Sequence, residues 1–313
     1  MKIAVTAALL YFALRGTDFT DLARRLKGLH VAWMAAAVAV LFAQLALVVV
    51  RWSKIAGYCG ADLPLPQGTH YTLIASFFNQ VLPSTVGGDA ARIWMFARDG
   101  AGWSKSTYSV LLDRFFGLLG LALMVVISLP WSLTLIKSPG GQLALLAIGM
   151  CCIGGAAVFV ALGYLRWHRL MEWAPTRHLI QMSVTTREIM FSPRAIALVT
   201  ILSLVVHTLS VVAAWCAAQS VDAPFQFGQA LLLLPPVLLI ASVPISIAGW
   251  GVRESAFVLA FSYAGLSQAD GLIVSVLFGA AFFILGLAGG LTWLLNSEAL
   301  RFAGFKSEPP SQS

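Results

Sequence analysis

Charged residues are scarce in this chain. Asp, Glu, Lys and Arg make up 11% of its 313 residues, whereas hydrophobic residues make up 59%. A soluble domain carries about 25% charged residues, and so little polar surface cannot cover a soluble core of this size. The composition excludes a soluble globular protein and predicts an all-α fold, a polytopic integral membrane helical bundle. We expect one membrane domain over residues 1–296 and a short polar tail over residues 297–313.

Motifs for metal, redox and nucleotide chemistry are also missing. The four cysteines show no metal-binding or redox spacing, and the five histidines include no HExxH or other ligand pair. Residues 102–106 resemble a phosphate-binding loop only faintly, because no glycine precedes Lys105. Residues 88–92 faintly resemble lipid-headgroup transferases, but the further aspartates at helical spacing that would hold their metal are lacking. We expect no catalytic residues, no metal and no cofactor.

The net charge of +7 does not indicate a nucleic-acid partner, because the basic residues lie in short loops between apolar segments. The longest polar break, residues 166–194, contains five arginines and two glutamates. The positive-inside rule therefore predicts that this loop and the C-terminal tail face the cytoplasm. The side of the N-terminus depends on whether residues 69–83 cross the membrane fully, which the sequence leaves open.

Two of the apolar segments are too short to span a bilayer. Crossing needs about 20 apolar residues, and residues 69–83 and 253–265 fall below that length. Short segments interrupted by Gly or Pro, in matching positions of two halves, are typical of re-entrant or broken helices. The other apolar segments run roughly over 3–14, 31–50, 106–130, 142–164, 195–218, 227–247 and 271–295.

Each short segment adjoins a copy of one pattern, Pro-x4-Gly-x3-Arg. The first copy runs from Pro83 to Arg92 and the second from Pro244 to Arg253. Proline and glycine interrupt helices, and arginine at membrane depth is costly and usually marks a site. The pattern predicts two broken or re-entrant elements, around residues 69–98 and 227–265, related as an inverted repeat. The alternative is two unrelated loops that match by chance.

Charged residues at membrane depth form three clusters: Asp89 with Arg92, Asp113 with Arg114, and Arg253 with Glu254. Neighbours on a helix point about 100° apart, so we expect Asp113 to pair elsewhere, with Arg92 or Arg253. Arginine forks and helix N-termini both favour phosphate and other anions. We therefore expect substrate-binding residues at Asn79, Gln80, Pro83, Ser84, Thr85, Gly87, Gly88, Asp89, Arg92, Asp113, Arg114, Pro244, Ser246, Gly249, Trp250, Arg253 and Glu254.

Three further expectations concern single positions and the role of the clusters. Arg51-Trp52 follows an apolar run and indicates a span end, with a snorkelling arginine and an interfacial tryptophan. His207, alone in an apolar segment, is expected to hydrogen-bond to a neighbouring helix. The charged clusters have an alternative role as buried ion pairs that only lock the helices together.

The same motifs resemble a known family. The stretch from Asn79 to Arg92, then Asp113-Arg114 with Gly117, then the stretch from Pro244 to Glu254, are similar to the lysylphosphatidylglycerol synthase transmembrane-region family, also called the flippase-like domain family. The family includes the membrane domain of the bacterial multiple peptide resistance factor, which is associated with flipping lysylphosphatidylglycerol, and standalone relatives tied to hopanoid and glycolipid handling. The resemblance runs over essentially the whole chain.

The resemblance implies a lipid flippase of the bacterial inner membrane that moves a polar or anionic headgroup between leaflets. Its partners would be membrane lipids of an anionic phospholipid, hopanoid or glycolipid class. The tail of residues 297–313 leaves no room for the soluble aminoacyl transferase domain of full-length synthases, so we expect no enzymatic activity. The alternatives are a secondary transporter for a small anion, and an assembly or accessory protein with structural ion pairs.

Overall fold

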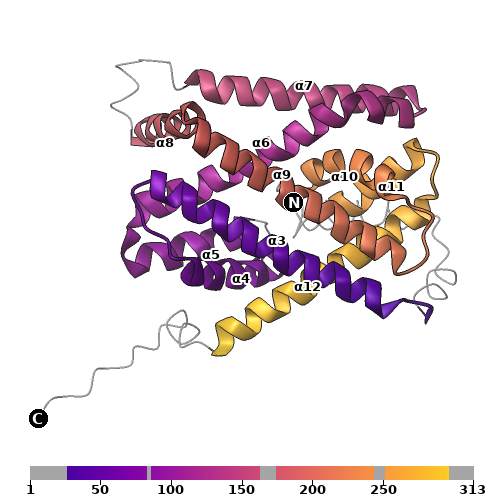
Figure 1. Cartoon of the computed structure of the whole chain (residues 1–313), viewed down its shortest axis with the longest axis horizontal. Helices are drawn as coiled ribbons and strands as arrows, with labels where there is room; N and C mark the ends of the chain where they lie inside the picture. Colours follow the sequence, from indigo (N-terminus) through magenta and orange to yellow (C-terminus); the bar gives the residue numbers. More distant parts are fainter. Residues whose placement is uncertain (1–26, 83–85, 163–173, 243–250, 296–313) are drawn as a thin grey trace, which may run out of the picture.

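A computed structural model describes residues 27–82, 86–162, 174–242 and 251–295 (Figure 1). These residues form helices and no strand, as the composition predicts. The elements are α3 (Val31–Tyr58), α4 (Leu65–Val81), α5 (Val86–Phe96), a π-helical turn η1 (Ala97–Ala101), α6 (Trp103–Leu135), α7 (Pro139–Leu162), α8 (Ala174–Phe191), α9 (Pro193–Gln219), α10 (Phe227–Ala241), α11 (Val252–Tyr263) and α12 (Gln268–Leu295).

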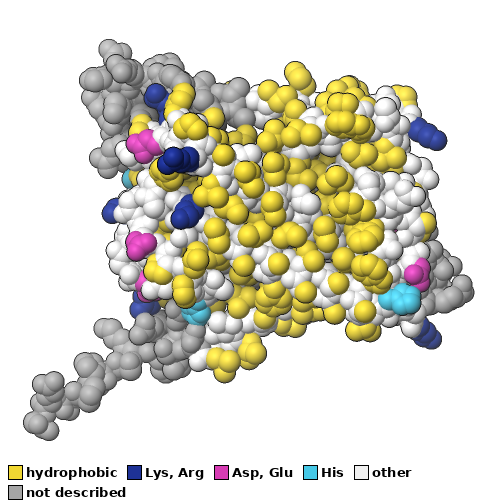
Figure 2. All heavy atoms as spheres, in the orientation of Figure 1, with side chains coloured by type: hydrophobic (Ala, Val, Ile, Leu, Met, Phe, Trp, Pro, Cys, Tyr) yellow, Lys and Arg dark blue, Asp and Glu magenta, His cyan; other side chains and the backbone are white. Residues whose placement is uncertain are grey.

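Within the described residues, the four helices α3, α6, α9 and α12 are long and apolar enough to cross a membrane. Hydrophobic side chains cover the central band of the face drawn in Figure 2, and the charged side chains gather towards its two ends. This distribution matches a bilayer whose hydrocarbon surrounds the band. The chain is therefore a multi-pass membrane protein.

The described helices repeat one arrangement. A long helix, two short helices and a long helix occur as α3–α4–α5–α6 and again as α9–α10–α11–α12, with α7 and α8 between them. The contacts between helices correspond in the two sets. Helix α4 of the first set packs on α12, just as α10 of the second set packs on α6. In the same way, α3 packs on α12 and α9 packs on α6. The first helices of the two sets, α3 and α9, pack on each other. The two sets are thus related by a pseudo-two-fold arrangement.

The two sets run in opposite directions. The backbone N–H of His30, just before α3, donates to the carbonyl of Ser220, just after α9, at 2.8 Å. Nearer the other end, Arg51 of α3 donates to the Ser203 hydroxyl of α9 at 3.0 Å. The start of one helix therefore lies beside the end of the other, and the repeat is inverted, as the sequence predicts.

Helices α4 and α5 form a re-entrant pair, which we call the first hairpin. Lys105, in the first turn of α6 that follows α5 and η1, donates to the carbonyl of Gly60, in the loop before α4, at 2.8 Å. The Tyr71 hydroxyl of α4 donates to the Asp99 carboxylate. The hairpin therefore enters and leaves at the same end of the bundle, which answers the question that the sequence leaves open about residues 69–83.

Helices α10 and α11 form the second hairpin, which returns to the opposite end. The Phe225 ring, before α10, lies 4.6 Å from the Phe261 ring near the end of α11. The short lengths of α4 (17 residues) and α11 (12 residues) confirm that neither segment spans alone.

The inner ends of the two hairpins approach the middle of α12; by hairpin tips we mean these described ends, Gln80 in α4 and Arg253 in α11. A Cβ on Gly279 would lie 2.8 Å from Cζ of Arg253, in the first turn of α11, and one on Gly286 would lie 3.0 Å from Cγ of Gln80, in the last turn of α4. These glycines are seven residues apart, or about 10 Å along the helix axis, and they flank the midpoint of α12. Close contact with glycine thus brings both hairpin tips to mid-depth.

This arrangement makes a labelling prediction. In the orientation that the positive-inside rule favours, α8 faces the cytoplasm and the α11–α12 turn faces outside. With the native cysteines replaced, a membrane-impermeant maleimide applied to intact cells should label Ser267→Cys and leave Gln181→Cys unlabelled; both positions are exposed. The reverse pattern would invert the orientation.

Candidate anion site at the first hairpin

Five charged side chains from three helices form an alternating chain, which we call the charge ladder. Arg51 of α3 donates through Nε to Asp113 Oδ1 of α6 at 2.8 Å. Arg92 of α5 donates through Nη1 to Asp113 Oδ2 at 3.2 Å and through Nη2 to Asp89 Oδ1 at 2.9 Å. Arg114 of α6 donates through Nε to both Asp89 oxygens, at 3.0 and 2.8 Å. The ladder therefore ties α3, α5 and α6 together.

The ladder is buried at one end and open at the other. The exposed fractions of the side chains are 5% for Arg51, 2% for Asp113, 4% for Arg92 and 13% for Asp89, but 47% for Arg114. Three arginines face two aspartates, so the ladder carries one excess positive charge. That excess has access to a ligand only at Arg114.

Aromatic and hydroxyl groups hold the ladder in place. The Arg92 guanidinium lies 4.7 Å from the centre of the Trp52 ring, a cation–π contact. Trp52 in turn donates through Nε1 to the Ser109 hydroxyl at 3.1 Å. The interpretation of Arg51-Trp52 as a snorkelling span end is wrong, because α3 continues to Tyr58 and buries both side chains.

Glycine at position 88 lets α5 lie directly on α4. A Cβ there would come within 2.6 Å of Cγ of Asn79. The backbone N–H of Gly88 also donates to Asn79 Oδ1 at 3.0 Å. Gly87 packs as closely on Leu82, where a Cβ would lie 2.6 Å from Cδ1. These contacts set the position of Asp89 and Arg92, so Asn79, Gly87 and Gly88 support the ladder from behind.

The second hairpin carries a smaller cluster. Arg253 donates through Nη2 to Glu254 Oε1 at 2.6 Å and through Nε to the Ser275 hydroxyl of α12 at 3.2 Å. The Gly251 N–H donates to Glu254 Oε2 at 2.6 Å, and Gly251 has φ +85°, which favours glycine. One arginine and one glutamate neutralise each other here, so the two hairpins differ in charge.

The clusters enter the bundle from opposite ends. Asp113 lies ten residues after Trp103, or about 15 Å along α6, from the end where the first hairpin enters. Ser275 lies seven residues after Gln268, or about 10 Å along α12, from the other end. Each arginine therefore lies within its own half of the membrane thickness.

Sequence reasoning and structure agree on some of these residues. Asp113 pairs with Arg92 as expected, whereas its alternative partner Arg253 is wrong, because Arg51 and Arg92 bind the two Asp113 oxygens. His207 contacts the Gly117 carbonyl of α6 through Nε2 at 2.8 Å, as predicted. Several expected site residues lie outside the described residues: Pro83, Ser84, Thr85, Pro244, Ser246, Gly249 and Trp250.

The sequence analysis did not assign four residues that contact the two charged clusters: Arg51, Ser203, Ser275 and Gly279. Of these, only Arg51 is unusual in the sequence, because it is a charged residue directly after an apolar run. Serine and glycine are common in membrane helices, and nothing in their spacing distinguishes the ones that contact arginine.

The open end of the ladder has the chemistry of an anion site. Within the described residues, Arg114 makes hydrogen bonds only through Nε, so Nη1 and Nη2 keep their donors for a ligand. A planar guanidinium presents paired donors that match a phosphate or carboxylate. Because Asp89 holds Nε in place, the outer edge of the fork is oriented before a ligand arrives.

Gly279 makes a testable contribution to the second cluster. Gly279→Ala should displace the Arg253 guanidinium, because the new Cβ would lie 2.9 Å from Nη1, and should lower the Tm. Gly154→Ala on α7 is the matched control, since it meets open space and gains helix propensity. Thermal unfolding of the purified variants compares them, and equal Tm values would contradict the close contact.

Comparison with known proteins gives one match. The family described as the lysylphosphatidylglycerol synthase TM region matches residues 1–290, which include both hairpins and all residues of the two charged clusters. No curated protein matches the chain.

Proposed function

Because the chain belongs to the lysylphosphatidylglycerol synthase transmembrane-region family, we propose that it moves a lipid with an anionic headgroup between the leaflets of a bacterial inner membrane. The observation that carries this proposal is Arg114, a half-exposed arginine at membrane depth with two unbonded donor groups. The substrate would be a lipid whose phosphate binds this fork while its acyl chains stay in the bilayer.

The energetics favour such a ligand. An arginine near the middle of a membrane helix costs about 2.5–3.5 kcal/mol on insertion scales. A phosphate that accepts hydrogen bonds from the exposed fork offsets part of that cost. The other charges of the ladder are already paired, so the free charge of +1 favours a lipid with a net negative charge over a zwitterion, whose ammonium group it repels.

The inverted hairpins give this lipid a route. A headgroup bound at Arg114 starts from the half of the membrane that the first hairpin enters, and Arg253 lies in the other half, near the middle of α12. Movement of one hairpin tip against the other would transfer the headgroup across mid-depth. We propose that no covalent bond changes, so the protein acts as a translocator and not as an enzyme.

The double variant Arg92→Lys with Arg253→Lys tests the role of the forks. One ammonium cannot bridge Asp89 and Asp113 as the Arg92 fork does. Asp89 then no longer holds Arg114 in its fixed orientation; if this misplacement costs the bound headgroup one charge-assisted hydrogen bond, worth about 1.5–3 kcal/mol, transport should fall by about ten-fold or more. The measurement is leaflet exposure of the lipid, normalised to folded protein in the membrane.

The outcomes separate the proposal from its alternatives. Lost lipid exposure in folded double variant supports translocation through the forks. Normal exposure would reduce the clusters to structural ion pairs, as in an assembly or accessory protein. Uptake of a soluble anion by the wild-type protein, without lipid movement, would identify a secondary transporter.

A further inference from the structure

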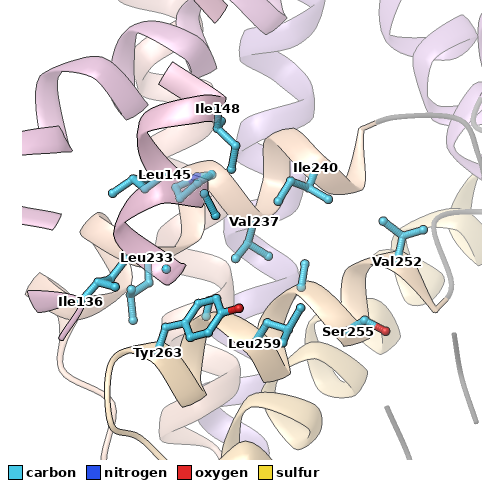
Figure 3. Close-up of a pocket in the computed structure, with 15 residues that line it drawn as sticks. Ile136, Leu145, Ile148, Leu233, Val237, Ile240, Val252, Ser255, Leu259 and Tyr263 are labelled. Atoms are coloured by element: carbon cyan, nitrogen blue, oxygen red, sulfur yellow. The ribbon is translucent and has the colours of Figure 1, made fainter. Parts of the chain in front are cut away.

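An apolar groove lies between α7 and the second hairpin, on the face of α11 that carries Val252, Ala256 and Tyr263. It has a volume of about 330 Å³ and is closed on three sides by α7, α10 and α11. Figure 3 shows side chains from the three helices converging on it. Fifteen residues line it, and among them only Ser255 and Tyr263 carry a polar side-chain atom.

The groove is long and parallel to the helix axes. Its lining residues recur every three or four positions along α11, from Val252 to Tyr263. Val252 and Tyr263 are eleven positions apart, which corresponds to about 16 Å of helix. One leaflet of a bilayer has about 15 Å of hydrocarbon, so the groove is as long as one leaflet is deep. A straight, apolar channel of this length fits a single hydrocarbon chain.

The groove is open to bilayer lipid along one side, and a basic residue, Lys137, lies at its outer end. Ile240 and Leu259 line the groove and are still 38% and 41% exposed, so bilayer lipid reaches its open side. At the outer end, Ile136 lines the groove and the next residue, Lys137, is exposed. A basic residue at this level is placed to attract the phosphate of a lipid whose chain enters below it.

We propose that this groove holds one acyl chain of an anionic phospholipid from the leaflet on the side of Lys137, the outer leaflet in the orientation given above. This proposal rests on the proposed function, because it identifies where the chain of the translocated lipid lies. The inner end of the groove, at Ile240 and Val252, adjoins the tip of the second hairpin. A lipid bound in the groove therefore has its acyl chain beside α11, the helix that carries Arg253.

The experiment uses the full-length protein in vesicles containing phosphatidylglycerol with a photoreactive diazirine on one acyl chain. Val237 and Ala256 line the groove and are almost fully buried, so bulk lipid labels them only by entering it. Met150 is 71% exposed and serves as an internal control for ordinary lipid contact. We expect labelled peptides from all three positions in the wild-type protein.

Two matched variants complete the test. Ala144→Trp fills the groove from α7, whereas Ala147→Trp adds the same side chain to the same helix outside the lining; both alanines are exposed. Labelling of Val237 and Ala256 should be lost in Ala144→Trp and retained in Ala147→Trp, with Met150 labelled in both. Absence of labelling at Val237 and Ala256 in the wild-type protein, or equal loss in the two variants, would overturn the groove assignment. Groove labelling in a protein that moves no lipid would leave this site standing and refute the proposed function.

Discussion

Asp113→Ala is expected to destabilise the folded protein more than any other single substitution in the ladder. Both oxygens of Asp113 are used, one by Arg51 and one by Arg92, and all three side chains are at most 5% exposed. Alanine would leave the buried Arg51 guanidinium with only the neutral Ser203 hydroxyl as partner, and Arg92 with Asp89 alone, which it shares with Arg114. Breaking a buried pair by removing one partner costs about 3–5 kcal/mol, so a large fall in Tm should follow.

The control is Asp222→Asn, because Asp222 has a φ of +51°, a backbone conformation that Asn adopts more readily than Ala. Asp222 also contacts a basic side chain, that of His30, at 3.1 Å, but the Asp222 side chain is 80% exposed. Exposed pairs contribute little to stability, so this variant should unfold close to the wild-type Tm. Thermal unfolding in detergent, followed by a thiol-independent probe, would compare the two. Similar Tm values for both variants would refute the ladder as the element that joins α3, α5 and α6.

Arg114→Gln is expected to have the largest effect on transport with the smallest effect on stability. Asp89 keeps its bond to Arg92 when Arg114 is lost, so no buried carboxylate is left without a cation. The variant removes the unbonded guanidinium donors that belong to the one exposed arginine of the ladder. If these donors bind the headgroup through a charge-assisted hydrogen bond worth about 1.5–3 kcal/mol, translocation should fall roughly 10- to 100-fold.

Arg98→Gln provides the comparison for Arg114→Gln. Arg98 is an exposed arginine at the rim, stacked on Trp94 at 4.7 Å, and it lies outside the ladder. Both variants lose one positive charge, but only Arg114→Gln should lose transport. A similar loss in both would mean that the overall positive charge near this surface matters and that the ladder has no specific role.

Much of the fold can be predicted from the sequence, because the composition of a segment largely determines whether it forms a membrane helix. Low charge and long apolar segments predict the helical bundle, and the two short segments beside Pro-x4-Gly-x3-Arg predict the hairpins. The matching short segments also predict that the repeat is inverted, but the contacts that join the two halves, such as the bond between His30 and Ser220, are tertiary. Nothing in the local sequence states which helix end lies beside which.

The site was only partly predictable for a physical reason. Arg92, Asp113 and Arg114 stand out because charges at membrane depth are rare. Arg51 follows an apolar run, where a charge usually indicates the membrane surface, and only its pairing with Asp113 explains why α3 continues past it. Gly279 lies among other glycines of α12, and its role depends on a side chain from α11.

The most direct test of lipid translocation uses purified wild-type protein in vesicles with fluorescent lipids in both leaflets. Dithionite bleaches the outer leaflet, and continued bleaching reports lipid that has crossed. The charge ladder predicts that labelled phosphatidylglycerol crosses faster than in protein-free vesicles, whereas labelled phosphatidylcholine does not, and that Arg114→Gln abolishes the difference. Equal rates with and without protein for both lipids, or an acceleration that Arg114→Gln leaves unchanged, would contradict translocation through this site.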